Sequence, residues 1–492
     1  MHHIMAIDQG TSSSRAIIFD LDGRIVGMGQ RPFDMVFPAN GWVEQEPEVL
    51  WQTTLGAGRE AIANAGLSAS DIDVMGITNQ RETTLVWDRQ TGECLYNAIV
   101  WQDRRTAGQC ENMRADGMQQ SVARITGLVV DPYFSGTKLA WLLGNISGLR
   151  ERAESGELCF GTVDSFLIWR LTRGARHVTD ASNAARTMLF DIGSQSWSDE
   201  LLRYLDVPVT LLPEVLDCAA DFGVADARWF GAPIPILGVA GDQQAALIGQ
   251  GCLRPGMTKS TYGTGCFIIA NTGKQQLVSQ QQLLATVGYR IQGETTYALE
   301  GSIFVAGASI KWLRDNLGLI DDASESGVAA VRCGGDAAGV YFVPAFTGLG
   351  APHWAPQARG LISGLTLDTS RDQIVTAALQ SVAFQTAELV GAMGEDGAGV
   401  ERLRVDGGMV INDWLCQFLS DMLELPVQRP VITETTALGV AMLAGLGGGL
   451  VTSLEDAAAL WTLEREFLPS MPAKRRTELL SGWRRAVAKA LL

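Results

Sequence analysis

Residues 4–20 read Ile-Met-Ala-Ile-Asp-Gln-Gly-Thr-Ser-Ser-Ser-Arg-Ala-Ile-Ile-Phe-Asp, and the fold prediction begins from this pattern. Two apolar runs, Ile4 to Ile7 and Ala16 to Asp20, flank a polar turn, which is typical of two strands joined by a hairpin. A similar pattern recurs at 257–271, where two predicted strands, Met257 to Tyr262 and Cys266 to Asn271, flank Gly263-Thr264-Gly265. The repeated pattern suggests the hypothesis of an internal duplication.

Outward from this hairpin, predicted strands and helices alternate along the chain, which indicates an α/β protein. Pro47 suits a first helical turn, so a helix is predicted from there to Gly66. The further predictions are strands over 74–78, 234–239 and 402–405 and a helix over 372–393. A chain of 492 residues exceeds what one hydrophobic core usually organises. We therefore predict two domains, residues 1–250 and 251–492, with the crossing in the glycine-rich segment 249–256.

Composition and charge exclude several classes of protein. Hydrophobic residues make up 47% of the chain and the formal net charge is -16, so we expect a packed globular protein that binds no nucleic acid. None of the eight cysteines forms a CxxC pair, which argues against a zinc site or a disulfide framework. The amino terminus lacks signal-peptide features. The most apolar run, Ala437 to Leu446, is too short to span a membrane, so a cytoplasmic protein is expected.

Three glycine-containing turns suggest phosphate binding, because backbone N–H groups hold phosphates and glycine lets the backbone come close. They are Gly10 to Arg15, Gly263 to Gly265 and Gly407-Gly408. The first offers hydroxyls and the Arg15 cation, but it lacks the GxxxxGK[ST] pattern and the GxGxxG fingerprint. Taken alone such a turn is an ordinary β-hairpin; three in one α/β chain favour nucleotide binding.

Two aspartates follow predicted strands. Asp8 ends the first strand beside the polar turn, where a carboxylate would hold Mg²⁺ directly or through water. Asp242 follows the strand over 234–239 in Ala-Gly-Asp-Gln-Gln. It is either a helix N-cap or the general base that accepts the proton of an attacking hydroxyl. The two interpretations require different rotamers.

The adjacent pair Arg81-Glu82 follows the strand over 74–78. It is either a solvated surface pair or, at the carboxyl edge of a parallel sheet, a set of donors and acceptors for neighbouring hydroxyls. Trp101, Tyr133 and Phe267 lie in polar or glycine-rich surroundings. They either pack in the core or form a wall against a carbon chain. The four histidines have no metal-ligand spacing, and no GxSxG elbow supports a hydrolase.

Together these segments resemble the glycerol kinases of the FGGY carbohydrate kinase family over essentially the whole chain. The segments that carry the resemblance are AIDQGTSSSR (6–15), GITNQRETT (76–84), NAIVWQ (97–102), DPYFSGTK (131–138), AGDQQAA (240–246), TYGTGCF (261–267), PAFTGLGAP (344–352) and RVDGG (404–408). Their number, order and spacing make chance agreement implausible.

The resemblance implies two ribonuclease H-like domains of the actin/hexokinase superfamily around a central cleft, in which ATP, Mg²⁺ and glycerol meet. Asp242 becomes the catalytic base. The resemblance assigns the glycerol site to Arg81, Glu82, Trp101, Tyr133, Asp242, Gln243 and Phe267. It assigns ATP or ADP binding to Thr11, Ser12, Ser13, Arg15, Thr264, Gly307, Gly408 and Asn412, and Mg²⁺ to Asp8. Relatives form dimers and tetramers, so a homodimer or homotetramer is expected.

Two departures from the family pattern bear on function. The family commonly has Gln in Ala-Ser-Ile-Gln-Trp, whereas this chain has Lys311, which would contact a phosphate or face solvent. The segment before Ile234 has neither the glycine-rich fructose 1,6-bisphosphate loop nor the phosphorylatable His of some relatives. The alternatives to a glycerol kinase are a family member acting on xylulose, ribulose or gluconate and a non-catalytic actin-like ATP-binding protein.

Overall fold

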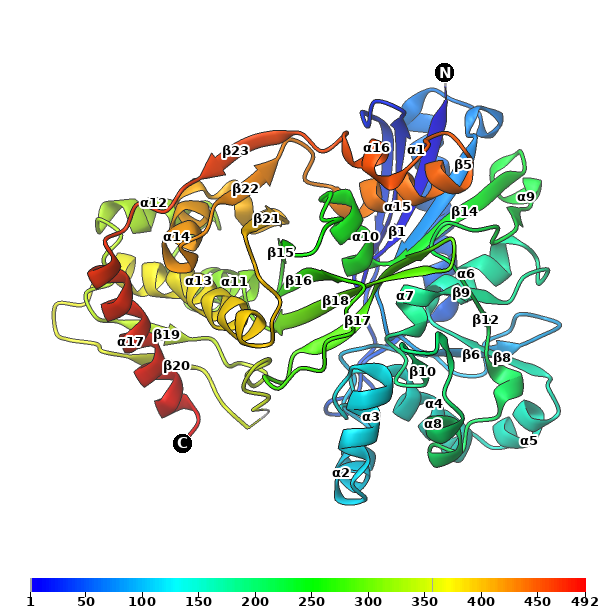
Figure 1. The fold of residues 1–492 in the computed structure, drawn as a ribbon, viewed down its shortest axis with the longest axis horizontal. Helices are drawn as coiled ribbons and strands as arrows, with labels where there is room; N and C mark the ends of the chain where they lie inside the picture. The colour runs from blue at the N-terminus through cyan, green and yellow to red at the C-terminus, as the bar shows by residue number, and fades with distance from the viewer. Residues whose placement is uncertain (1, 356) are drawn as a thin grey trace.

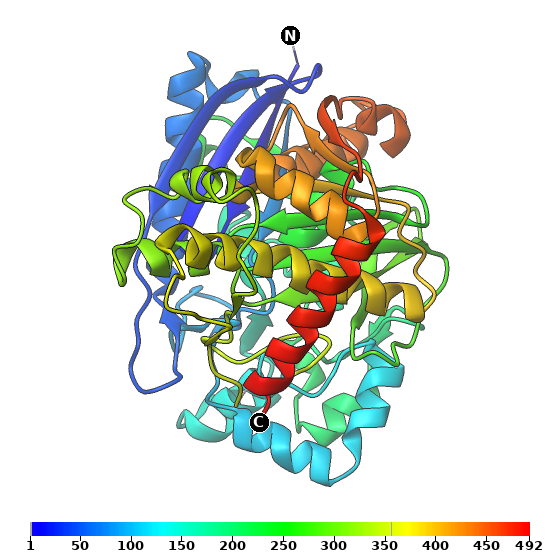
Figure 2. The same cartoon turned by 90° about the vertical axis from the view of Figure 1, so that its left-hand side faces the viewer.

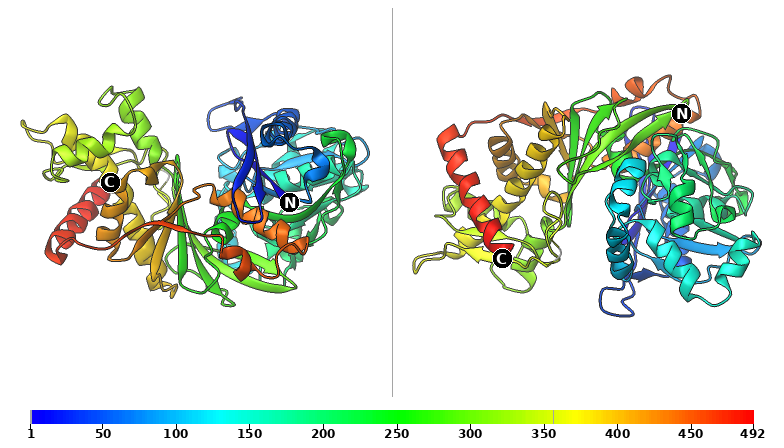
Figure 3. Two further views of the ribbon diagram at one scale, coloured as in Figure 1. Left: turned by 90° about the horizontal axis from the view of Figure 1, so that it is seen from above. Right: turned by 60° about the horizontal axis from the view of Figure 1, so that its bottom comes forward.

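The computed structural model describes residues 2–355 and 357–492. It has two lobes (Figures 1 and 3), each with one large β-sheet. Strands of the sheet of the second lobe lie between the helices of that lobe and the first lobe. Each lobe is organised around a large β-sheet with helices packed against it, as the α/β prediction requires.

The first sheet has six strands in the order β13-β14-β5-β1-β2-β3. β1 pairs antiparallel with β2 and parallel with β5, and β5 pairs parallel with β14. The predicted strands over 4–7, 16–20, 74–78 and 234–239 are confirmed within it, each extended by a few residues. Its strands are β1 (His3–Gln9), β2 (Ser13–Asp20), β3 (Ile25–Pro32), β5 (Val74–Asn79), β13 (Val224–Ala225) and β14 (Ile234–Gly241).

The second sheet has seven strands in the order β17-β18-β16-β15-β21-β22-β23. Within it β18-β16-β15 are antiparallel neighbours and β15-β21-β22 are parallel neighbours. The run β3-β2-β1-β5-β14 of the first sheet has the same sequence of pairings, which supports the duplication hypothesis. The strands are β15 (Met257–Tyr262), β16 (Cys266–Gly273), β17 (Leu284–Ile291), β18 (Glu294–Ile303), β21 (Arg402–Asp406), β22 (Val427–Pro430) and β23 (Leu463–Phe467).

Two helices cover opposite faces of the first sheet. Helix α1 (Pro47–Ala65) begins with the predicted proline and ends where Gly66 adopts the left-handed conformation. It packs with the β1 side chains Met5 and Ile7. The alternate residues of β1 face α15 (Thr435–Gly447), which comes from the other end of the chain. Period-two alternation thus buries both faces of β1.

Helix α15 also packs closely against α10 (Asp242–Gly249), the helix that follows β14. Glycines make this approach feasible: a Cβ on Gly249 would collide with the Thr435 backbone, and a Cβ on Gly439 with the Ala245 backbone. The predicted domain division between residues 250 and 251 stays a prediction. The structure adds that α15, which comes late in the chain, completes the core of the first lobe.

The long predicted helix is α13 (Arg371–Glu395), which lies in the core of the second lobe beneath α17 (Ala473–Ala490), red in Figure 2. Among the described residues it is the helix long and apolar enough to cross a membrane by length and composition. The expectation that 437–446 comes closest to the length of a membrane-spanning helix was therefore wrong. Two thirds of the apolar window of α13 is buried inside the protein, which accounts for its composition.

The remaining elements connect or cover these sheets. The other helices are α2 (Ala107–Ala115), α3 (Met118–Thr126), α4 (Ser135–Asn145), α5 (Leu149–Glu154), α6 (Val163–Leu171), α7 (Ala181–Ala184), α8 (Asp199–Tyr204), α9 (Ala227–Phe230), α11 (Gly307–Asp315), α12 (Glu325–Arg332), α14 (Asp413–Leu423) and α16 (Leu454–Ala458), with short 3-10 turns at Ala69–Asp71, Val209–Leu211 and Gly408–Ile411. Short strands pair as β4 (Glu44–Gln45) with β7 (Ala98–Ile99), β6 (Leu85–Asp88) with β8 (Leu158–Gly161), β9 (Val178–Asp180) with β12 (Glu214–Leu216), β10 (Phe190–Asp191) with β11 (Ser196–Trp197), and β19 (Tyr341–Val343) with β20 (Leu361–Ser363).

Candidate active site

Arg81 and Glu82 lie just beyond the carboxyl end of β5, and both are buried, with 3% and 1% of their surface exposed. The interpretation as a solvated surface pair is therefore wrong. Glu82 has a φ of 63°, a left-handed backbone that bulky residues rarely adopt. The chain thus turns sharply at the strand end and directs both charged side chains inward.

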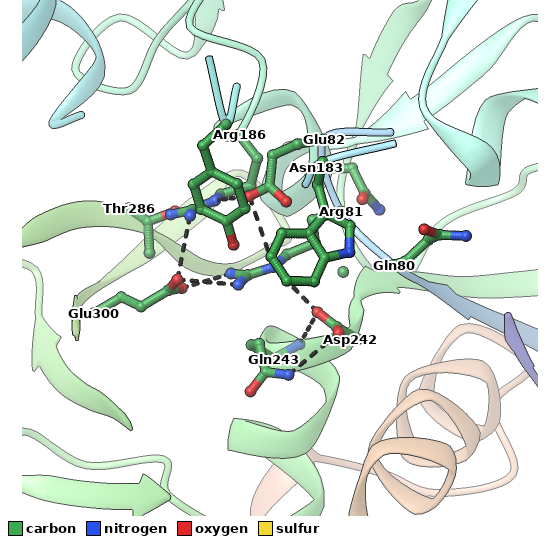
Figure 4. A network of polar contacts seen from close by, with 12 residues as sticks. Gln80, Arg81, Glu82, Asn183, Arg186, Asp242, Gln243, Thr286 and Glu300 are labelled. Carbon is green, nitrogen blue, oxygen red and sulfur yellow. Dashed lines mark hydrogen bonds and ion pairs between the residues drawn. The ribbon is translucent and has the colours of Figure 1, made fainter. Parts of the chain in front are cut away.

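Two further charged residues complete this cluster (Figure 4). Glu300 of β18 accepts hydrogen bonds from Nη1 and Nη2 of Arg81 at 2.5 and 3.0 Å. Arg186, two residues beyond α7, donates from Nε to Glu82 at 2.7 Å and from Nη2 to Glu300 at 3.2 Å. We call Arg81, Glu82, Arg186 and Glu300 the buried charge cluster. It joins the first sheet to the second.

Burial and charge act against each other in this cluster. Burial raises the pKa of Glu300, but Arg186 and Arg81 outweigh that effect and lower the pKa to about 2. For Glu82 burial prevails over the same arginines, so its pKa is raised above the ordinary value. Burial lowers the pKa of Arg81 and Arg186, and the neighbouring carboxylates more than restore it.

Asp242 is the first residue of α10, and Gly241 occupies the N-cap position. The N-cap interpretation of Asp242 is therefore wrong, although its Oδ1 still accepts the backbone N–H of Gln243 at 2.7 Å. The same oxygen lies 3.1 Å from Nε of Arg81, and 31% of the Asp242 side chain is exposed. The carboxylate is thus anchored at one oxygen and still accessible to a substrate.

Gln243 lies between Asp242 and a buried lysine. Its side-chain amide donates to Oδ2 of Asp242 at 3.2 Å, and its Oε1 accepts a hydrogen bond from Nζ of Lys259. Lys259 belongs to β15 and also donates to Thr261 at 3.0 Å. A second contact from the second sheet thus reaches the residues beside Asp242.

The three aromatic residues lie together. Trp101 makes edge-to-face contacts with Tyr133 at 5.5 Å and with Phe267 at 6.3 Å between ring centroids. The Arg81 guanidinium lies 6.0 Å from the Phe267 ring, and Arg186 lies 5.7 Å from the Tyr133 ring. The aromatic group therefore borders the buried charge cluster. It supplies an apolar wall next to hydrogen-bonding groups.

The polar turn between β1 and β2 adjoins this wall, because Nε1 of Trp101 donates to Oγ1 of Thr11 at 3.0 Å. Ser12 is exposed, and Ser13 accepts a hydrogen bond from Gln30 at 3.1 Å. Arg15 forms an ion pair with Glu434, which immediately precedes α15. The turn thus exposes Ser12 to solvent, and its cation, Arg15, is paired with the Glu434 carboxylate.

Asp8, at the end of β1, is the candidate metal ligand. Burial raises its pKa to about 7; Asp242 and Glu434 add to this effect, and Arg15 opposes it. Among the described residues no hydrogen bond reaches the Asp8 carboxylate, and no group of three His, Cys, Asp or Glu side chains could hold a metal. The Asp8 carboxylate thus has charged neighbours of both signs, Arg15, Asp242 and Glu434, and its oxygens can serve as ligands of a hard cation. Such a cation would draw its other ligands from water and a bound phosphate, as Mg²⁺ usually does.

A cavity of about 760 Å³ opens in the second lobe. Gly307, Gly408 and Asn412 line it together with apolar side chains of α11, α12 and α14. Gly307 begins α11, and a Cβ there would approach the Gly263 carbonyl to 2.6 Å. Asn412 also caps α14 by accepting the N–H groups of Trp414 and Leu415 at 3.1 and 3.2 Å.

Thr264 lies beside this cavity in the turn between β15 and β16, and its side chain is exposed. Its carbonyl accepts N–H groups of Ala306 and Ala308 at 2.9 and 3.1 Å, which fixes the turn against the start of α11. Lys311, the departure from the family pattern, lies on α11 and is exposed.

Sequence reasoning missed Arg186, Glu300, Lys259 and Glu434. Glu300 carried a signal, because a charged residue in the largely apolar run Ala298 to Ile303 needs a buried partner. Arg186 and Lys259 are likewise wholly buried cations. The partners of Arg186 lie 104 and 114 positions away in the chain, so the sequence alone could not pair them.

Family models match most of the chain. The N-terminal domain model of the FGGY family of carbohydrate kinases matches residues 3–249, and the C-terminal domain model matches residues 258–447. The chain belongs to the FGGY family of carbohydrate kinases. Both domains of the FGGY fold are therefore present, in the order expected from the sequence.

Within the FGGY family, the chain is similar over its whole length to proteins that are named glycerol kinases. The chain is 58% identical over 488 residues to glycerol kinase 1 of Pseudomonas aeruginosa, covering 99% of each. It is 56% identical over 493 residues to the glycerol kinase of Rhizobium meliloti, covering 100% of this chain and 99% of that protein.

Solved structures agree. The crystal structure of Plasmodium falciparum glycerol kinase with ADP superposes with a TM-score of 0.93 at 35% identity, covering 100% of this chain and 99% of that one. The gluconate kinase of Lactobacillus acidophilus superposes with a TM-score of 0.88 at 18% identity, covering 99% and 97%, and shares the fold. The expected two-domain FGGY architecture is thereby confirmed.

Proposed function

We infer that this protein is an ATP-dependent kinase that transfers the γ-phosphoryl group of ATP to glycerol, giving sn-glycerol 3-phosphate and ADP. The observation that carries the proposal is the accessible Asp242 carboxylate, which lies 3.1 Å from Arg81, beside buried Glu82 and an aromatic wall. The site thus combines a base, groups that can bind hydroxyls and an apolar surface. Whole-length relatives are named glycerol kinases, which supports glycerol over a sugar.

Asp242 acts in this proposal as the general base. Its anchored oxygen keeps the carboxylate in place through Arg81 and the Gln243 N–H, while the exposed part of the side chain accepts the proton of the attacking hydroxyl. A positioned base contributes about 10²–10⁴ in rate. Phosphoryl transfer depends mainly on alignment of the attacking and leaving oxygens, so positioning is its first contribution.

The phosphates would be held between the two lobes. Thr11, Ser12, Ser13 and Arg15 approach from the first hairpin and Thr264 from its counterpart, while Gly307, Gly408 and Asn412 border the nucleotide cavity. Asp8 would hold Mg²⁺, which supplies charge neutralisation at the phosphates. Arg15 would contribute a fixed positive charge from the protein side.

Glycerol specificity would come from Arg81, Glu82, Tyr133, Asp242 and Gln243, with Trp101 and Phe267 against the carbon chain. A site built to bind hydroxyls rejects an analogue that lacks one by up to roughly 10⁴–10⁵. The penalty is large here because Arg81 and Glu82 are buried and would lose a partner.

Two features of the cellular form are also proposed. A homodimer or homotetramer is expected from the family resemblance. A cytoplasmic location agrees with eight free cysteines, which suit a reducing compartment.

The proposal is tested by ADP release with Mg·ATP against glycerol, dihydroxyacetone, xylulose, ribulose and gluconate, with the product identified by mass spectrometry. Efficient turnover of glycerol to glycerol 3-phosphate is the expected result. Turnover confined to a sugar would overturn the glycerol assignment. No ADP release with any acceptor would favour a non-catalytic ATP-binding protein.

A further inference from the structure

Glu300 is a wholly buried carboxylate that reaches the glycerol site from the other lobe. It lies on β18 of the second sheet, whereas its partners Arg81 and Arg186 belong to the first lobe. None of the Glu300 side chain is exposed. It therefore acts on the site through other side chains rather than by contact with solvent or with a substrate in the cleft.

The hydrogen bonds of Arg81 show what Glu300 controls. A guanidinium has five N–H donors in a fixed plane. Glu300 takes one from Nη1 and one from Nη2, and Gln244 takes another from Nη1 at 3.3 Å. The Nε–H and one Nη2–H remain, and the Nε edge faces Asp242. Bidentate pairing thus fixes both the plane of the guanidinium and the edge that it presents.

We propose that Glu300 is a positioning residue for glycerol recognition: it clamps Arg81 from the second lobe and so directs the Nε edge of Arg81 towards Asp242 and the polyol. The inference rests on the proposed function and deepens it. Arg186 extends the clamp, because it links Glu300 to Glu82. The two substrate-binding residues that follow β5 thus share one support in the other lobe.

Charge balance makes the clamp effective. Without Glu300, Arg81 and Arg186 would be two buried cations with Glu82 as their nearest remaining carboxylate within the cluster. The Arg81 guanidinium would lose the bidentate pair that fixes its plane, and with it the position of the Nε that lies 3.1 Å from Asp242. The hydroxyl-binding edge would be lost at the same time.

A merely structural ion pair between the lobes is the competing explanation, and the chain offers a matched control for it. Arg290 of β17 donates from Nε to Asp217 of the first lobe at 2.5 Å, and the Gly293 N–H donates to the same carboxylate at 2.8 Å. Asp217 thus also joins the two lobes through an arginine, and it contacts none of the proposed glycerol-binding residues.

The experiment compares Glu300→Gln, Glu300→Asp and Asp217→Asn with the unaltered enzyme. Steady-state kinetics are measured for glycerol and for 1,2- and 1,3-propanediol, each of which lacks one hydroxyl of glycerol. ADP binding and Tm are measured in parallel to follow folding. We expect Glu300→Gln to lower kcat/KM for glycerol about 10²-fold, since small misplacements of positioning groups have effects of that size. The preference for glycerol over the propanediols should shrink, while the KM for ATP changes little.

Each outcome has a definite meaning. Glu300→Asp keeps the charge but withdraws the carboxylate, so an intermediate loss of discrimination supports the clamp. Asp217→Asn should lower Tm without altering discrimination. If both Glu300 variants retain the full preference for glycerol, or if Asp217→Asn loses it equally, the proposal is overturned. Failure of the unaltered enzyme to phosphorylate glycerol would instead refute the proposed function.

Discussion

The two halves of the site are built in opposite ways. The glycerol side consists of buried charges, with each member of the buried charge cluster paired at 2.5–3.2 Å. The nucleotide side is a cavity of about 760 Å³, lined by glycines and apolar side chains with few charged groups. Hydrogen bonds between side chains fix the shape of the glycerol side, whereas the course of the backbone fixes the shape of the nucleotide side.

This difference suits the two ligands. A small polyol offers little area, so discrimination must come from buried polar groups that lose a partner when a hydroxyl is missing. A nucleotide offers a large surface and phosphate charges, which backbone N–H groups and glycine turns can accommodate. Substitutions of the charged side chains should therefore impair the use of glycerol, and substitutions of the glycines should impair the binding of ATP.

The largest effect is expected at Asp242. Asp242→Asn removes the proton acceptor but keeps the shape and one oxygen, so kcat should fall about 10²–10⁴-fold. ADP binding, measured by titration calorimetry, should stay close to that of the unaltered enzyme. A variant with near-normal kcat would show that Asp242 is not the base.

Arg81→Lys tests the glycerol side. Lysine is a point charge and cannot pair in bidentate fashion with Glu300. We expect kcat/KM for glycerol to fall roughly 10²-fold through loss of alignment, with little change in the KM for ATP. Steady-state kinetics with each substrate varied in turn provide the measurement. An equal rise in both KM values would contradict the separation of the two halves.

Gly307→Ala tests the nucleotide side. The added Cβ would come within 2.6 Å of the Gly263 carbonyl, which is backbone and cannot move aside easily. Overpacking costs about 1–3 kcal/mol, so the KM for ATP should rise roughly 5- to 150-fold while glycerol binding is spared. Gly391→Ala on α13 is the matched control, because a Cβ there meets nothing within 4 Å. A similar rise in both variants would refute the explanation.

The smallest effect concerns stability away from both halves. Burial lowers the pKa of His177 to about 4, against the opposing effect of its hydrogen bond to the Phe160 carbonyl. The unfolded chain binds a proton below about pH 6.5 that the folded state excludes, so stability falls as pH falls from 6.5 to 4, by at most about 3 kcal/mol. His177→Gln keeps a donor for Phe160 and should flatten this dependence. Tm measured between pH 4 and 7 gives the result; an unchanged slope would exclude His177.

Local patterns accounted for most of the fold. The strands around 4–20 and 257–271 and the helix from Pro47 were predictable because apolar runs, glycine turns and a proline at a helix start act over a few residues. The buried charge cluster was not. Arg81 pairs with Glu300 across 219 positions, and Arg186 pairs with Glu300 across 114. Only the folded sheets bring these residues together, so sequence could suggest that Arg81 matters but not what supports it.

The packing of α15 has a consequence for synthesis of the chain. The face of the first sheet formed by Ile4, Ala6 and Ile17 is covered by residues 435–447, which leave the ribosome after every strand of that sheet. A nascent chain that ends before α15 therefore holds an apolar sheet face with nothing to bury it. The first lobe can complete its core only after nearly the entire protein has been made, and incomplete chains are exposed to aggregation and proteolysis until then.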